Sequence, residues 1–156
     1  MINPEARVWI YQANQPLSQT QLNEISAILE DFTTSWTAHN QALKANFEIK
    51  YDRFIVLIVD ETQAGASGCS IDKSVHLIQE LEKKFQINLL DRFNIAYKEG
   101  NVVKSVDRSG FEELIKSGAV TSATPVFNNM VSNYQDYQNK WETTIANSWH
   151  SSVFSV

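Results

Sequence analysis

Several residue types on which whole protein classes depend are scarce in this chain. Its 156 residues include one cysteine, five glycines and three prolines. One cysteine cannot form an internal disulfide, which excludes a disulfide-stapled domain and removes any need for an oxidising compartment. No apolar run approaches the ~20 residues of a membrane-spanning helix, and the first residues lack the basic and apolar stretches of a signal peptide. We therefore expect a cytoplasmic protein without a membrane partner.

Positive charge is also scarce. The chain carries 13 lysines and arginines against 18 aspartates and glutamates, which gives a formal net charge of −5 at pH 7. Its longest basic stretch is the pair Lys83-Lys84. Nucleic acids and anionic membranes select basic surfaces, so we expect no nucleic-acid partner. The sequence also contains neither a Walker A loop nor a dinucleotide-binding fingerprint.

What the chain does contain is enough apolar surface for a core. Apolar residues make up 43% of the sequence and charged residues 20%, with eight phenylalanines and four tryptophans. A chain of this length buries about 68–70% of the surface that its unfolded form exposes, so no covalent staple is needed. We predict that residues 1–156 form a single globular domain.

The spacing of the apolar residues predicts an α+β fold. Alternating or continuous apolar runs predict strands, and steps of three and four residues predict helices. Strands are expected at Arg7–Gln12, Phe47–Tyr51, Phe54–Val59, Phe93–Tyr97 and Val102–Val106. Helices are expected from Ser18 to Trp36, from Ile71 to Phe85, around Phe111, and from Pro125 to Trp149. This order predicts a ferredoxin-like β-α-β-β-α-β core with a hairpin extension and a long C-terminal helix.

The clearest candidate for a site is the loop Ala64–Ser70, which joins a buried strand to a helix. Its small residues leave backbone N–H groups free to bind a ligand. The expected ligand-binding residues are Asp60, Gly65, Ser67, Gly68, Ser70 and Asp72. Two of them have simpler explanations. Asp60 is where a buried strand meets water, and Asp72 opposes an incoming anion and is expected to cap the helix.

The only cysteine, Cys69, lies in the same loop. The positive end of a helix dipole stabilises a thiolate, so Cys69 is a candidate catalytic nucleophile. Its base would be His39 or His150, the two other candidate catalytic residues. The alternatives are structural: Cys69 is buried in the corner between strand and helix, His39 lies at a helix C-terminus, and His150 belongs to a docked tail.

Five segments spread along the chain resemble an uncharacterised family of small bacterial proteins, mostly from the Bacteroidetes. They are Val8–Ala13, Trp36–His39, Val59–Glu61, Ala66–Asp72 and Ser148–His150. Members of that family are sometimes labelled ABC-transporter ATPases, although this chain has neither a Walker A loop nor an ABC signature motif. The resemblance implies relatives along nearly the whole chain, and it implies no activity or mechanism.

These observations lead to one expected function and two alternatives. We expect a module that binds a small molecule or a protein partner through residues 64–72, without a metal or other cofactor. The first alternative is a thiol-dependent enzyme with Cys69 as its nucleophile. The second is a structural subunit, in which aromatic residues on the C-terminal helix form a homodimer interface. The sequence leaves open whether the protein is an enzyme.

Overall fold

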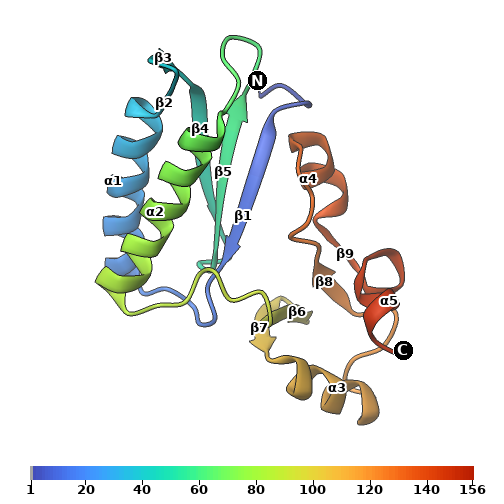
Figure 1. Cartoon of the computed structure of the whole chain (residues 1–156). Coiled ribbons are helices and arrows are strands. Elements are labelled where there is room, and N and C mark those ends of the chain that lie inside the picture. The colour runs from blue at the N-terminus through green and yellow to red at the C-terminus, as the bar shows by residue number, and fades with distance from the viewer. Residues whose placement is uncertain (1) are drawn as a thin grey trace.

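Two antiparallel sheets that pack against each other form the centre of the fold (Figure 1). The computed structural model describes residues 2–156. The first sheet has the order β1-β5-β4, with β1 at Arg7–Gln12, β5 at Phe54–Asp60 and β4 at Lys44–Lys50. The second has the order β7-β6-β8-β9, at Val102–Val106, Ile95–Glu99, Pro125–Phe127 and Glu142–Thr144. A third sheet pairs only β2 (Thr37–Ala38) with β3 (Gln41–Ala42). Together with the helices, these sheets confirm an α+β fold.

Strand β5 is shared by both halves of the core. All of its residues are buried, and it pairs with β1 on one side and with β4 on the other. Successive side chains of a strand point to opposite faces. Ile55 and Leu57 accordingly pack against helices. Phe54, Val56 and Ile58 belong to a cluster on the other face, which includes Ala96 and Phe127 of the second sheet and Tyr137 and Trp141 of the C-terminal segment. An uninterrupted apolar strand needs cover on both faces, as its sequence predicts.

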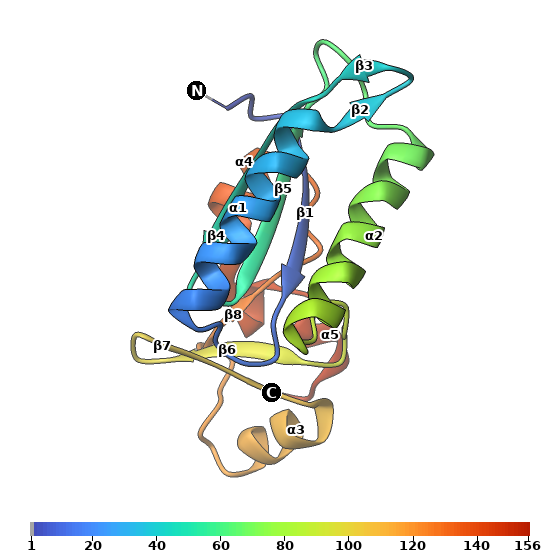
Figure 2. The same cartoon turned by 90° about the vertical axis from the view of Figure 1, so that its left-hand side faces the viewer.

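Helices α1 (Gln19–Ser35) and α2 (Gly68–Phe85) cover the same face of the first sheet (Figure 2). Each begins with a capping box, in which an N-cap serine and the residue three positions later bond each other's backbone N–H: Ser18 with Gln21, and Ser67 with Ser70. The first box starts α1 at Ser18, where the sequence predicts the helix to begin. The second starts α2 a few residues before Ile71, the expected start. No helix in residues 2–156 combines the length and the apolar character that crossing a membrane requires.

The other face of the second sheet is covered by α3 (Arg108–Lys116) and α5 (His150–Val153). Asp107 caps α3, since its Oδ1 accepts the Gly110 N–H at 2.7 Å. The buried residues of this layer are Ile95, Tyr97, Phe111, Val120, Val126, Ile145 and Phe154. The fold therefore has four layers: helices α1 and α2, the first sheet, the second sheet, and helices α3 and α5.

The fourth strand of the predicted ferredoxin-like core lies elsewhere. Strands β1, β4 and β5 have the expected antiparallel order, but β6 joins the second sheet instead of pairing with β1. The outer edge of β1 pairs with the segment 132–134. Val8 N–H donates to Ser132 O at 3.0 Å, and Tyr134 N–H donates to Ala6 O at 2.8 Å. An open strand edge invites pairing with other chains, and this segment covers part of it.

The predicted long C-terminal helix is wrong. Its residues form β8, the helix α4 (Tyr134–Lys140), β9, a 3₁₀ turn η1 (Ile145–Asn147) and α5. Asn133 breaks the pattern because its Oδ1 accepts the Asp136 N–H at 2.8 Å and starts a new helix. The large aromatic residues of the segment are buried against the first sheet: Phe127, Tyr137 and Trp141. The expected homodimer interface therefore lacks its helix, and the homodimer stays a prediction.

A chain of hydrogen-bonded amides connects β1 to the second half of the molecule. The buried Gln12 donates Nε2–H to Asn94 O at 3.0 Å and accepts a bond from Asn129 Nδ2 at 2.9 Å. Asn129 Oδ1 in turn accepts the Trp141 Nε1–H at 2.9 Å. The loss of one member of such a network leaves its neighbours unsatisfied.

We predict that Gln12→Met lowers the free energy of unfolding by about 1–3 kcal/mol, because methionine fills a similar volume but leaves the Asn129 and Asn94 partners unpaired. Urea denaturation followed by circular dichroism measures the change. Gln15→Met is the matched control, since Gln15 is exposed three residues away. Equal stability of the two variants would contradict a structural role for the network.

Candidate functional site

Asp60, the first acidic residue of the predicted site, has partners within the protein. Thr62 donates its backbone N–H at 3.0 Å and its hydroxyl at 2.7 Å to Asp60 Oδ1. Lys44 Nζ lies 3.6 Å from Asp60 Oδ2. The bond from the Thr62 hydroxyl is the main reason that the pKa of Asp60 lies below its usual value. These contacts give Asp60 a structural role at the end of β5.

Side chains of the predicted loop already bond several of its backbone N–H groups. Glu61 Oε2 accepts the Ala66 N–H at 2.8 Å. The reciprocal bonds of Ser67 and Ser70 occupy both of their N–H groups. Within residues 2–156, two N–H groups at the start of α2 keep no partner: those of Gly68 and Cys69. Backbone donors at the loop are therefore fewer than its sequence suggests.

Two further predicted residues of this loop have different outcomes. At Gly65, a Cβ would lie 3.2 Å from Glu61 Oε2, so the absence of a side chain lets this carboxylate reach the Ala66 N–H. The expectation that Asp72 caps α2 is wrong. Ser67 is the N-cap, and Asp72 lies exposed beyond the first turn.

The three candidate catalytic residues do not meet. Cys69 is exposed, so it does not fill the corner between strand and helix. No hydrogen bond links its thiol to another residue of the described chain. His39 lies in the turn between β2 and β3 with a left-handed φ of 50°, so its expected position at a helix C-terminus is wrong. His150 belongs to α5, which lies far from the start of α2 in Figures 1 and 2.

His150 is a core residue. Its side chain is 1% exposed, its Nδ1 contacts Ser148 Oγ, and its ring stacks on Trp149 with 3.8 Å between ring centres. Burial lowers its pKa to about 4, because the charged form loses its hydration. The imidazole is therefore neutral near pH 7, and its contacts are those of a docked C-terminal segment.

An open hollow of about 440 Å³ lies where the β4–β5 turn meets α4 and β9. We call it the Tyr51 hollow. Its lining residues are Lys50, Tyr51, Tyr137, Gln138, Trp141 and Glu142. Its volume lies within the range of small-molecule sites in proteins. None of the residues predicted from the sequence contributes to it.

Each tyrosine of the Tyr51 hollow donates its hydroxyl to a carboxylate that also contacts a lysine. Tyr51 Oη–H donates to Glu142 Oε2 at 2.6 Å, and Lys98 Nζ bonds Glu142 Oε1. The Lys98 ammonium also lies 4.9 Å from the centre of the Tyr51 ring, within cation–π range. The second tyrosine repeats the pattern: Tyr137 donates to Glu48 Oε1 at 3.0 Å, and Lys50 Nζ lies 3.7 Å from that oxygen.

These contacts determine the charge of the hollow. Burial alone would raise the pKa of Glu142, but the hydrogen bonds from Lys98 and Tyr51 outweigh it and hold the pKa below its usual value. The bond to Glu142 raises the pKa of Lys98. Burial is the main reason that the pKa of Tyr137 lies well above its usual value, and the charge of Glu48 adds to this shift. At neutral pH both hydroxyls are therefore protonated, and two ammonium groups balance two carboxylates.

The backbone at Tyr51 is strained. Tyr51 and Asp52 are the first two of the three residues in the β4–β5 turn, with φ of 54° and 55°, a left-handed conformation that tight turns usually reserve for asparagine and glycine. A bulky side chain in this region costs of order 1–3 kcal/mol. Ring contacts offset this cost: the Tyr51 ring centre lies 5.5 Å from that of Phe127 and 6.2 Å from that of Trp141.

Sequence reasoning missed the Tyr51 hollow for two reasons. Its lining residues come from β4, the β4–β5 turn, α4 and β9, which are up to 92 positions apart between Lys50 and Glu142. The expected C-terminal helix also placed Tyr137 and Trp141 on one helix stripe. One signal was present, since the strands Phe47–Tyr51 and Phe54–Val59 are joined by a tight turn without glycine or asparagine.

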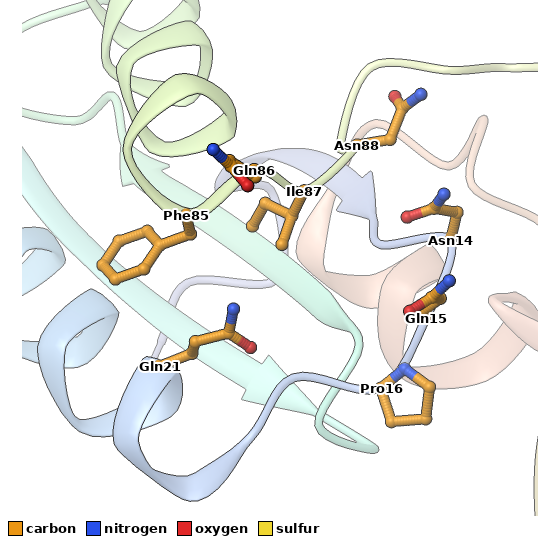
Figure 3. A pocket seen from close by; sticks show the side chains of 8 residues that line it. All are labelled: Asn14, Gln15, Pro16, Gln21, Phe85, Gln86, Ile87 and Asn88. Carbon is orange, nitrogen blue, oxygen red and sulfur yellow. The ribbon is translucent and has the colours of Figure 1, made fainter.

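A second hollow, of about 380 Å³, lies between the end of α2, the loop after β1 and the start of α1 (Figure 3). It is lined by Asn14, Gln15, Pro16, Gln21, Phe85, Gln86, Ile87 and Asn88. It holds no ionisable side chain. Two of its amides already serve local turns, since Gln21 Oε1 accepts the Ser18 N–H and Asn88 Oδ1 accepts the Asp91 N–H. The Tyr51 hollow has more varied chemistry and is the stronger candidate.

No protein-family model, curated protein or solved structure matches the chain. The resemblance to the small bacterial family therefore stays a prediction. No group of three or more His, Cys, Asp or Glu side chains within residues 2–156 is arranged to hold a metal ion.

The buried His150 predicts a loss of stability at mildly acidic pH. Because its pKa is about 4 in the folded protein against 6.5 for an ordinary histidine, the folded state binds fewer protons between these values. The free energy of unfolding therefore falls as the pH falls through this window. The loss is about 2 kcal/mol from a pH of about 8 to a pH of about 5. Urea denaturation at both pH values measures it, with His150→Asn as the comparison. A variant with the same pH dependence would contradict this prediction.

The exposed thiol predicts that Cys69 is alkylated in the native protein. We expect iodoacetamide to modify one site without denaturant and Cys69→Ser to remain unmodified, as followed by mass spectrometry. His39→Ala should leave the rate unchanged, because no hydrogen bond joins His39 to Cys69. Slower alkylation of His39→Ala would instead support the hypothesis that His39 acts as the base for Cys69.

Proposed function

We propose that this protein is a binding module for a small, neutral, hydroxyl-bearing ring compound, which it holds in the Tyr51 hollow. The observation that carries the proposal is the pair of tyrosines beside Trp141, each fixed by a carboxylate. Their ring centres lie 6.2 Å and 5.2 Å from that of Trp141. Aromatic side chains that are held in place lose little entropy when a ligand binds, which favours affinity.

The charge balance of the hollow supports a neutral ligand. Lys98 is paired with Glu142, and Lys50 lies beside Glu48, so the two positive and two negative charges cancel. A charged ligand would have to compete with one of these internal pairs, whereas a neutral one leaves both intact.

The rim provides the polar groups that a hydroxyl-bearing ligand requires. Gln138 uses one amide hydrogen on Tyr134 Oη at 2.8 Å, and its oxygen has no partner in the described chain. The Lys50 ammonium has only the 3.7 Å contact with Glu48. Both side chains are exposed and lie at the hollow, so they can bond hydroxyl groups while the exposed ring of Tyr51 contacts the flat face of the ligand.

The test is a titration with a panel of neutral monosaccharides and nucleosides, followed by saturation-transfer NMR. We expect Gln138→Ala to weaken binding at least about fivefold, the value of one neutral hydrogen bond. Gln135→Ala is the matched control, because Gln135 is exposed on the same helix outside the hollow. Absence of any binder in the panel, or an equal effect of the two variants, would contradict the proposal.

The same titration separates this proposal from the predicted binding loop at residues 64–72. A ligand in the Tyr51 hollow leaves the rate of Cys69 alkylation unchanged, whereas a ligand at the loop slows it. The thiol-enzyme alternative has no base beside Cys69 to support it. The structural-subunit alternative predicts a stable dimer, which light scattering measures.

A further inference from the structure

Arg53 is the one arginine of the described chain that is buried. Arg53 is 6% exposed, and its guanidinium forms no ion pair with any carboxylate in residues 2–156. Only one of its guanidinium nitrogens has partners. Nη1 donates to Ser105 Oγ at 2.8 Å and to Ala13 O at 3.5 Å. The Nε and Nη2 nitrogens bond no acceptor of the described chain.

A buried cation without a counter-ion is costly, because desolvation is not repaid by an opposite charge. Burial lowers the pKa of Arg53, and no neighbouring charge offsets this effect. The neutral oxygens of Ser105 and Ala13 satisfy one edge of the guanidinium only. Buried charges need a partner, and the planar guanidinium matches the geometry of carboxylate and phosphate groups, so an oxyanion is the partner that Arg53 fits.

The unpaired edge of Arg53 keeps a small exposed area. In the part of the chain that the structure describes, the buried side-chain nitrogen and oxygen atoms without a partner are Asn94 Oδ1 and Trp149 Nε1. Nε and Nη2 of Arg53 are not among them, so they keep contact with solvent although most of the residue is covered. These two nitrogens form the side of a guanidinium that binds two oxygens at once.

We propose that Arg53 is an oxyanion-binding site, in which Nε and Nη2 bond two oxygens of a carboxylate or a phosphate group. This site is independent of the ligand proposed for the Tyr51 hollow, which does not include Arg53. Ser105 and Ala13 hold the guanidinium from its other edge and orient it for the oxyanion.

The test is made on the wild-type chain with sodium phosphate and sodium acetate, each against sodium chloride at the same ionic strength. We expect the Arg53 Nε–H signal in NMR spectra to shift with one or both oxyanions. The midpoint temperature of thermal unfolding should rise by about 4 °C when the oxyanion is present at ten times its Kd. A response to phosphate or to acetate identifies which oxyanion is bound. An Arg53 signal that stays unchanged with both would overturn the proposal.

Variants check that the response belongs to this residue. Arg53→Lys keeps the charge but loses the planar edge, and we expect it to lose most of the thermal shift. Arg53→Gln should lose all of it. Arg108→Gln is the matched control, since it removes an exposed arginine that pairs with Glu112 and should respond as the wild type does. An undiminished shift in Arg53→Gln would overturn the assignment, and if that variant does not fold, the wild-type NMR signal still decides it.

Discussion

The burial of β5 on both faces is the constraint on which the rest of the structure depends. Helices α1 and α2 cover only one face of this strand. Leaving Phe54, Val56 and Ile58 exposed on the other would forfeit roughly 5–9 kcal/mol, at 1.5–3 kcal/mol for each buried side chain. That loss is comparable with the whole stability of a domain. The C-terminal half must therefore supply a second cover, which explains why β6 joins β8 in a new sheet and why Phe127 and Trp141 face inward.

The junction of the two halves lies at the β4–β5 turn. Tyr51 reaches Glu142 on β9 and Lys98 on β6, while Arg53 reaches Ser105 on β7. The turn is thus fixed to three strands of the second sheet by residues that are costly where they lie, one in backbone strain and one in desolvation. Features of this kind persist only where surrounding contacts hold them: the rings of Phe127 and Trp141 at Tyr51, and Ser105 and Ala13 at Arg53.

The parts of the fold that could be predicted are those with local causes. The capping box of α1, the hairpin Ile95–Val106 and the apolar run of β5 depend on residues that are close in sequence. The C-terminal helix could not be predicted correctly, because buried aromatic residues at steps of three and four also suit short strands and turns once a neighbouring sheet needs cover. The Tyr51 hollow and the buried Arg53 depend on contacts between distant segments, which no spacing in the sequence shows.

The same distinction explains why the geometry favours the β4–β5 turn over the loop at residues 64–72 as a binding site. The loop is completed by its own side chains: Ser67, Ser70 and Glu61 bond its N–H groups, and its thiol has no neighbouring base. A ligand there would meet mainly one segment. At the turn, aromatic rings and paired charges come from three strands (β4, β6 and β9), from the turn itself and from α4, and Arg53 of the turn adds an unpaired guanidinium. A ligand at the turn would therefore contact groups whose positions depend on the packing of both halves, so that its recognition depends on the intact fold.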